Sequence, residues 1–317
     1  MRNVVPGAVD RLVYGDGRDR VRAVWRVLVP VFVGFLAFGV AGGIATSLGA
    51  DRGTTMLVSF GGVTLVAAGL LAVSARYLDE RPVSAYGYDL SRGWWLDLLV
   101  GTGVGALLVA LTVLIARGAG SLRITGTVPA AGESQVPGLV FFLLAFVGVT
   151  FYEEFLFRGL FITNAVEGLS ERGHSRLVAT AVALLASTAG FALIHLPSAL
   201  AQGADVALVA AQTGLLGGLL GTAYVLTDQL ALPMGLHLGV NYAMMNVFGI
   251  GAAGYEGIPT VLAVEVSATG PWSPTHGLPI LLATLVGFVP VIAWAYRRRD
   301  GFAFDRPTTR ARPEAER

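Results

Sequence analysis

Long apolar runs, separated by short polar segments, dominate the pattern of this chain. A helix that crosses the ~30 Å hydrocarbon core of a bilayer needs roughly 20 mainly apolar residues, and about eight runs reach that length. Their approximate limits are Val24 to Leu48, Thr54 to Ser74, Trp95 to Ala116, Pro137 to Thr163, Leu177 to Leu196, Val206 to Leu226, Leu230 to Ile250, and Leu278 to Tyr296. The pattern therefore predicts an all-α, polytopic transmembrane helical bundle.

Composition agrees with this fold class. Hydrophobic residues make up 54% of the chain, charged residues 14%, and the mean hydropathy is +0.68. An ordinary water-soluble domain is less hydrophobic and carries more charged residues. The 22 basic and 21 acidic residues nearly balance, so the charge does not indicate a nucleic-acid partner. Cysteine is absent, which excludes disulfides, thiolate metal sites and a cysteine nucleophile.

The arginines indicate an orientation, because positively charged loops stay on the cytoplasmic side. With the N-terminus inside, 18 of the 22 basic residues fall in inner segments, Arg52, Arg117 and Arg123 fall in outer ones, and Arg158 belongs to a motif. The first 20 residues are polar and show no removable signal peptide. We therefore expect a multi-pass protein of the plasma membrane with both termini in the cytoplasm.

Ionisable side chains interrupt the fourth run, where a charge at bilayer depth costs at least ~2.5 to 3.5 kcal/mol. Glu154 and Arg158 are four residues apart and share a helix face, so they can form an ion pair. Glu153 lies about 100° around the helix, with no obvious local cation, and suits a general base or acid. The alternative is that both glutamates are structural partners of Arg158.

Two further runs each carry polar side chains one helical turn apart. Phe191 and His195 form the first such pair, and His237 and Asn241 form the second. A lone histidine near a helix end is often only an interfacial anchor. However, an imidazole and a carboxamide on one face can both donate hydrogen bonds to a single oxygen, as stabilisation of an oxyanion requires.

Together these side chains form a hydrolytic set in which water is the nucleophile. Two histidines and a glutamate, here Glu153, His195 and His237, could also be ligands of a catalytic zinc ion. The chain has no His-Glu-x-x-His helix. We favour a metal-free mechanism with a glutamate base and keep zinc as the alternative cofactor.

The depths of these residues constrain the helices. Glu153 lies about ten residues from the inner end of its predicted span, His237 about seven and His195 about eighteen, at ~1.5 Å per residue. The depths agree only if the helices around residues 160–183 project beyond the bilayer on the cytoplasmic side.

The three motifs, Glu153-Glu154-x-x-x-Arg158, Phe191-x-x-x-His195 and His237-x-x-x-Asn241, resemble those of the CPBP intramembrane proteases, also called the CAAX prenyl protease or Abi family. The resemblance covers roughly Pro137 to Ile250. It implies that Glu153 activates water with help from His195, that His237 and Asn241 form the oxyanion site, and that Glu154 and Arg158 hold the architecture. It also implies membrane-associated protein or peptide substrates, including prenylated CAAX-like or transmembrane ones.

The predicted function is therefore that of an intramembrane endopeptidase. One alternative is a proton-coupled transporter that uses the glutamates and histidines as a relay, although no inverted repeat is evident. Another is a non-catalytic immunity or scaffold protein. We divide the chain into a cytoplasmic segment at 1–23, three spans at 24–136, the CPBP-like catalytic core at 137–250, an outer loop at 251–277, a last span at 278–296 and a disordered cytoplasmic tail at 297–317.

Overall fold

The computed structural model describes residues 12–14, 21–127, 135–201, 203–253, 255 and 257–299. Most of the predicted segments 1–23 and 297–317 lies outside these residues. The α-helices are α2 (Ala23–Ser47), α3 (Arg52–Val73), α4 (Arg92–Gly118), α5 (Val136–Glu154), α6 (Thr163–Ser170), α7 (Arg176–Ala201), α8 (Val206–Thr227), α9 (Ala231–Tyr242) and α10 (Leu278–Arg299). Shorter helical segments are η1 (Ser74–Leu78), η2 (Val83–Tyr86), η3 (Phe155–Ile162), η4 (Ala243–Val247) and η5 (Gly270–Trp272).

The predicted helical bundle is confirmed. In the described part of the chain, seven helices are long and apolar enough to cross a membrane, namely Ala23–Ser47, Arg52–Leu78, Arg92–Gly118, Val136–Ser170, Arg176–Pro197, Val206–Thr227 and Leu278–Arg298. The remaining predicted run, 230–250, forms the shorter α9 and its π-helical continuation η4. Every residue from Ala231 to Val240 is buried, as expected for a core helix of this length.

Two short strands depart from the all-helical prediction. Strand β1 (Leu122–Thr127) pairs antiparallel with β2 (Leu262–Val266), and Arg123 lies opposite Glu265. Both segments carry β-branched residues, Ile124, Thr125 and Thr127 in β1 and Val264 and Val266 in β2, which favour strands. The pair joins the end of α4 to the segment before α10, so residues 251–277 are not only loop.

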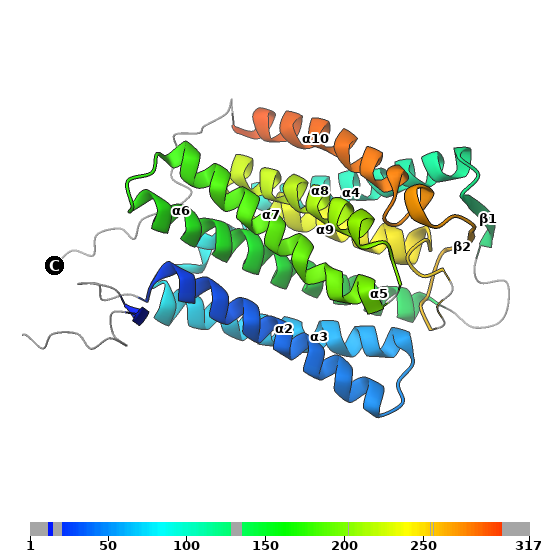
Figure 1. Ribbon diagram of the computed structural model, residues 1–317, viewed down its shortest axis with the longest axis horizontal. Helices are drawn as coiled ribbons and strands as arrows, with labels where there is room; N and C mark the ends of the chain where they lie inside the picture. Colours follow the sequence, from blue (N-terminus) through cyan, green and yellow to red (C-terminus); the bar gives the residue numbers. More distant parts are fainter. Residues whose placement is uncertain are drawn as a thin grey trace, which may run out of the picture.

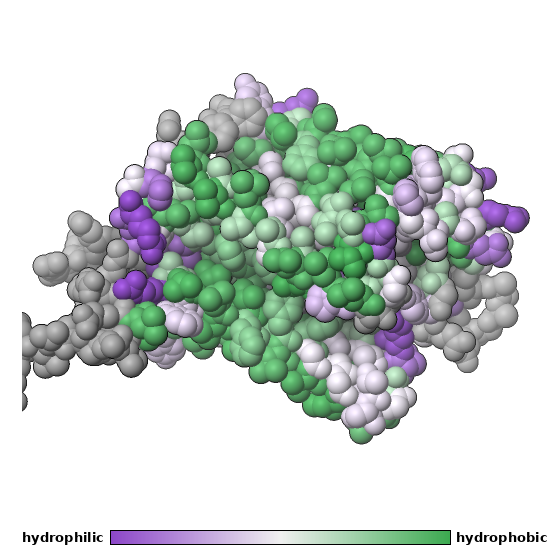
Figure 2. Space-filling view, viewed as in Figure 1, coloured by the Kyte–Doolittle hydropathy of each residue, from purple (hydrophilic) through white to green (hydrophobic). Residues whose placement is uncertain are grey.

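The helices form layers around α9 (Figure 1). The α2–α3 hairpin packs on α5 along one edge of the molecule, α10 packs on α4 and α8 along the opposite edge, and α9 contacts α4, α5 and α8 between them. On the face shown in Figure 2, hydrophobic residues cover the middle and hydrophilic ones gather toward the two ends. This distribution suits a bundle whose middle faces lipid.

Close contact between α4 and α9 fixes the position of the central helix. A Cβ atom at Gly101 or Gly105 would clash with backbone atoms of α9, and one at Gly235 or Gly239 would clash with backbone atoms of α4. Small residues spaced four apart allow such close approach of membrane helices. These glycines therefore hold α9, and the side chains that it carries, against a long spanning helix.

A buried charge cluster joins the N-terminal hairpin to α6. Arg26 in α2 donates to Asp79 (2.9 Å) and to Glu167 in α6 (3.2 Å), and Arg81 donates to the same Glu167 oxygen (2.6 Å). Asn164 of α6 also donates to Asp79 (3.0 Å). Buried charges are tolerated when they are paired in this way, so the cluster ties the start of α2 to the end of the long helix Val136–Ser170.

Candidate active site

Glu154 is the centre of a buried ionic contact between three helical elements. Its Oε1 accepts from Nη1 of Arg158 (3.0 Å) and lies 2.8 Å from Nδ1 of His237. A carboxylate can only accept, so Nδ1 carries the proton in this contact. Arg158 also donates from Nη2 to the carbonyl of Gly217 in α8 (3.1 Å). The predicted Glu154–Arg158 ion pair is present, and it orients His237 as well.

Glu153 has different surroundings. The hydroxyl group of Tyr152 donates to its Oε1 (2.8 Å). Its Oε2 is buried, has no hydrogen-bond partner among the described residues, and lies 3.7 Å from Nε2 of His237. Unpaired buried polar atoms are rare and call for an explanation. Glu154 Oε2 is likewise buried and has no hydrogen-bond partner among the described residues. The two carboxylates differ in their other contacts, because Glu154 binds a guanidinium and an imidazole through Oε1, whereas Glu153 accepts from a tyrosine hydroxyl group and has Oε2 near Nε2 of His237.

Phe191 links the second motif to the first and third. Its ring packs against those of His195 (centroids 4.6 Å apart) and His237 (5.8 Å), and the guanidinium carbon of Arg158 lies 4.5 Å from its centroid. Nδ1 of His195 lies 2.7 Å from the Phe191 carbonyl oxygen. The two histidine rings thus contact the same phenyl ring.

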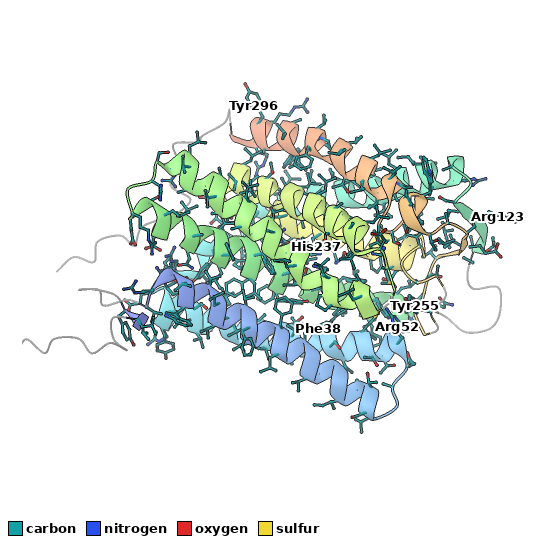
Figure 3. All side chains as sticks on the ribbon, in the orientation of Figure 1. Phe38, Arg52, Arg123, His237, Tyr255 and Tyr296 are labelled. Atoms are coloured by element: carbon teal, nitrogen blue, oxygen red, sulfur yellow. The ribbon has the colours of Figure 1, made fainter. Side chains whose placement is uncertain are left out.

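The remaining predicted site residue, Asn241, lies one turn beyond His237 on α9 and is half-buried. Figure 3 shows His237 in the interior of the bundle. The structure thus brings Glu153, Glu154, Arg158 and His237 into one group, with His195 attached through Phe191.

The length of the helix that carries Glu153 bears on the predicted depths. α5, η3 and α6 form one run of 35 residues, and at 1.5 Å per residue such a run is ~52 Å long. That exceeds the ~30 Å hydrocarbon core of a bilayer. This run is therefore longer than the apolar layer is thick, and the projection of residues 160–183 on the cytoplasmic side stays a prediction.

Sequence reasoning missed two partners of the site. Tyr152 is adjacent to Glu153 in the sequence, yet neighbours on a helix point about 100° apart, so the spacing did not suggest their hydrogen bond. The Gly217 carbonyl lies 59 residues from Arg158. A buried tyrosine beside an intramembrane carboxylate was the available signal, because a buried hydroxyl group needs a partner.

The zinc alternative finds no support in the geometry. Among the described residues, no three His, Cys, Asp or Glu side chains are grouped so that they could hold a metal ion. Glu153, His195 and His237 are therefore not gathered as a ligand set.

The segment that holds the three motifs matches one family model. Residues 135–243 match the family model of the Type II CAAX prenyl endopeptidase Rce1-like proteins. The matched segment is 109 of the 317 residues and contains all three motifs. No curated protein and no solved structure matches the chain. The family resemblance inferred from the motifs is confirmed over this Rce1-like segment, which lies within a multi-pass membrane protein.

Proposed function

We propose that this protein is an intramembrane endopeptidase in which Glu153 activates water. The observation that carries the proposal is the buried Oε2 of Glu153, which has no hydrogen-bond partner among the described residues and lies 3.7 Å from Nε2 of His237. A polar separation of that size suits a bridging water. The match of this segment to the Rce1-like endopeptidases supports the same reaction class.

In the proposed step, Glu153 takes a proton from water and the hydroxide oxygen bonds to the carbonyl carbon of the peptide. The carbon–nitrogen bond then breaks, and the proton held by Glu153 passes to the leaving amine. His195 assists the base. This sequence conserves atoms and charge, and it needs no metal or covalent enzyme intermediate.

His237 and Asn241 stabilise the oxyanion in this mechanism. Because Nδ1 of His237 donates to Glu154, Nε2 donates to the oxyanion only when the ring carries both protons. Glu154 therefore orients the imidazole and stabilises its charged form while the oxyanion exists, as preorganised donors do in acyl transfer. The Asn241 amide supplies the second donor.

We assign a membrane-associated protein or peptide as the substrate, either a prenylated CAAX-like chain or a transmembrane segment. The name of the matching family supports this class. The bundle supports it too, because a site in the interior of membrane helices meets substrates held at the bilayer. We also assign the protein to the plasma membrane, with both termini in the cytoplasm.

The test uses purified protein in liposomes and a fluorogenic prenylated or transmembrane peptide. Glu153→Gln keeps an acceptor for Tyr152 but removes the base, so the cleavage rate should fall by about 10²- to 10⁴-fold. Glu265→Gln, an exposed position on β2, is the matched control and should cleave normally. Cleavage that survives Glu153→Gln in a folded protein would overturn the proposal.

Chelation separates glutamate from metal catalysis in the same assay. Activity should persist after dialysis against a chelator. Loss of activity that zinc restores would instead favour a metal-dependent hydrolysis.

A further inference from the structure

A cavity of about 540 Å³ lies outside the candidate active site, where the start of α2 meets the region around α6 and α7. Its lining includes Arg22 just before α2, Val24 in α2, Phe161 in η3, Arg172 just after α6 and Val182 in α7. None of the proposed catalytic residues borders it. The cavity therefore needs an explanation of its own.

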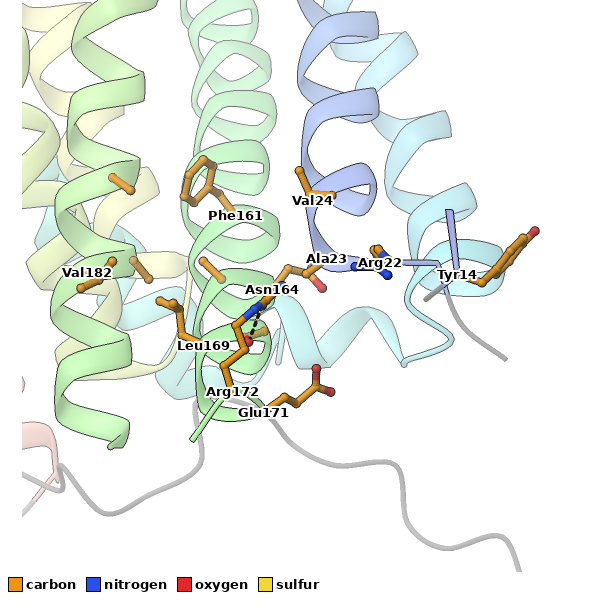
Figure 4. A pocket seen from close by; sticks show the side chains of 14 residues that line it. Tyr14, Arg22, Ala23, Val24, Phe161, Asn164, Leu169, Glu171, Arg172 and Val182 are labelled. Carbon is orange, nitrogen blue, oxygen red and sulfur yellow. Dashed lines mark hydrogen bonds between the residues drawn. The ribbon is translucent and has the colours of Figure 1, made fainter. Parts of the chain in front are cut away.

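The lining of the cavity is amphiphilic (Figure 4). Glu171 and Arg172 lie where α6 ends and Arg22 lies where α2 begins, whereas Val24 and Phe161 lie further along the helices. This end of the cavity carries two guanidinium groups and one carboxylate. An occupant with an anionic head and an apolar body matches both parts of the lining.

The helices around the cavity place it beside lipid. Both α2 and α7 are long and apolar enough to span a membrane, and their outer faces near the cavity carry exposed apolar side chains, including Val24 (51% exposed), Leu177 (69%) and Val182 (45%). The charged residues stand at the ends of these helices, where the hydrocarbon layer gives way to headgroups. A lipid molecule can therefore reach the cavity from the bilayer.

We propose that this cavity binds an anionic phospholipid with a single phosphodiester charge. Its phosphate contacts Arg22 and Arg172, and an acyl chain lies along Val24 and Phe161. Arginine is suited to phosphate because its fork of five N–H donors matches phosphate oxygens. The one bond from Arg172 to the Gly168 carbonyl (2.6 Å) leaves further donors on the same group. Basic pockets between membrane helices bind anionic headgroups in this manner.

Glu171 narrows the choice of lipid. It borders the cavity at the same end as Arg172, so a headgroup with several negative charges would meet a like charge. A phosphatidylglycerol headgroup carries one charge and avoids that repulsion. A zwitterionic lipid would bring a cation close to the guanidinium group of Arg172.

A lipid in this cavity would also stabilise the junction of α2 with α6. Asn164 borders the cavity and donates to Asp79 of the buried charge cluster. α6 in turn continues through η3 from the helix that ends in Glu153 and Glu154. A ligand that binds only the folded state raises the thermal midpoint, so lipid binding should be visible as stabilisation without any activity measurement.

The experiment compares lipid-depleted protein in micelles that contain either phosphatidylglycerol or phosphatidylcholine. Bound lipid is counted by native mass spectrometry, and Tm is recorded in parallel. The wild type should retain phosphatidylglycerol over phosphatidylcholine by roughly tenfold, since each basic residue near anionic lipid contributes a several-fold preference. Inorganic phosphate alone should neither raise Tm nor displace the lipid.

Three variants make the result specific. The double variant Arg22→Gln/Arg172→Gln should lose the preference, and Ala186→Trp, an exposed α7 position that borders the cavity, should reduce binding of both lipids by filling it. The control Arg117→Gln/Arg123→Gln removes two exposed arginines from the β1 end of the molecule and should bind as the wild type does. Any one of three results would overturn the proposal. These are equal retention of the two lipids by the wild type, an unchanged lipid preference in the double variant, and a rise in Tm with inorganic phosphate alone.

Discussion

At the scale of single residues, the site depends on how differently two adjacent carboxylates are held. Glu154 is engaged by Arg158 and His237 through one oxygen. Glu153 is held at one oxygen by the Tyr152 hydroxyl group, while the other faces His237. The geometry assigns Tyr152 to positioning, because its hydroxyl group fixes the rotation of the carboxylate that the proposed mechanism uses as a base.

Tyr152→Phe should therefore lower kcat while KM stays close to the wild-type value. A hydrogen bond to a charged group contributes about 1.5 to 3 kcal/mol, so we expect a decrease in kcat of roughly tenfold to a hundredfold. Steady-state kinetics on the fluorogenic peptide measure both constants. Tyr88→Phe is the control, since it removes the hydroxyl group of a half-buried tyrosine whose hydrogen bond to the Phe151 carbonyl is longer (3.4 Å). Equal effects of the two variants, or a change confined to KM, would contradict a positioning role.

From the sequence, contacts between individual side chains could be predicted only where both partners lie on one helix. The Glu154–Arg158 pair was predictable because residues four apart lie on one face. The contact between Glu154 and His237 joins residues 83 positions apart, and nothing in local spacing encodes it. The motifs identified which side chains matter, whereas the pairing among them depends on how α9 packs against α5.

At the scale of elements, the packing of α9 against α4 determines where His237 and Asn241 stand. Hydrophobicity alone suggested an eighth long span, and the structure has a shorter buried helix instead. The close approach of α4 and α9 at Gly101, Gly105, Gly235 and Gly239 could not be predicted from the sequence, because it joins helices far apart in the chain. The π-helical segment η3 and the β1–β2 pair were also missed, because the first has no periodicity of its own and the second joins segments far apart in the chain.

Gly239→Ala should displace α9 and lower both stability and activity. The added Cβ would clash with the backbone of α4 at Thr102, and overpacking of this kind costs about 1 to 3 kcal/mol. Gly103→Ala is a matched control on the opposing helix, because a Cβ there meets nothing within 4 Å and alanine favours a helix over glycine. We expect a lower Tm and slower cleavage for Gly239→Ala alone. Similar behaviour of the two variants would show that the α4–α9 contact does not hold the site.

At the scale of the whole molecule, the distribution of arginines relates the bundle to the membrane. The start of α2, the start of α4, the α6–α7 turn and the end of α10 carry most of the described arginines, whereas the opposite end carries Arg52, Arg117 and Arg123. The described chain begins and ends at the same end of the bundle (Figure 1). The proposed orientation, with this arginine-rich end in the cytoplasm, follows from the retention of positive loops on that side.

Cysteine labelling tests this orientation directly, because the chain has no cysteine of its own and one introduced thiol reports one position. Thr125→Cys lies on exposed β1, and His174→Cys lies in the exposed turn between α6 and α7. In intact cells, a membrane-impermeant maleimide should label Thr125→Cys and should label His174→Cys only after permeabilisation. The reverse labelling pattern would show that the protein has the opposite orientation in the membrane. The cavity near Arg22 and Arg172 would then lie in the outer leaflet, and substrates would reach the site from the opposite face.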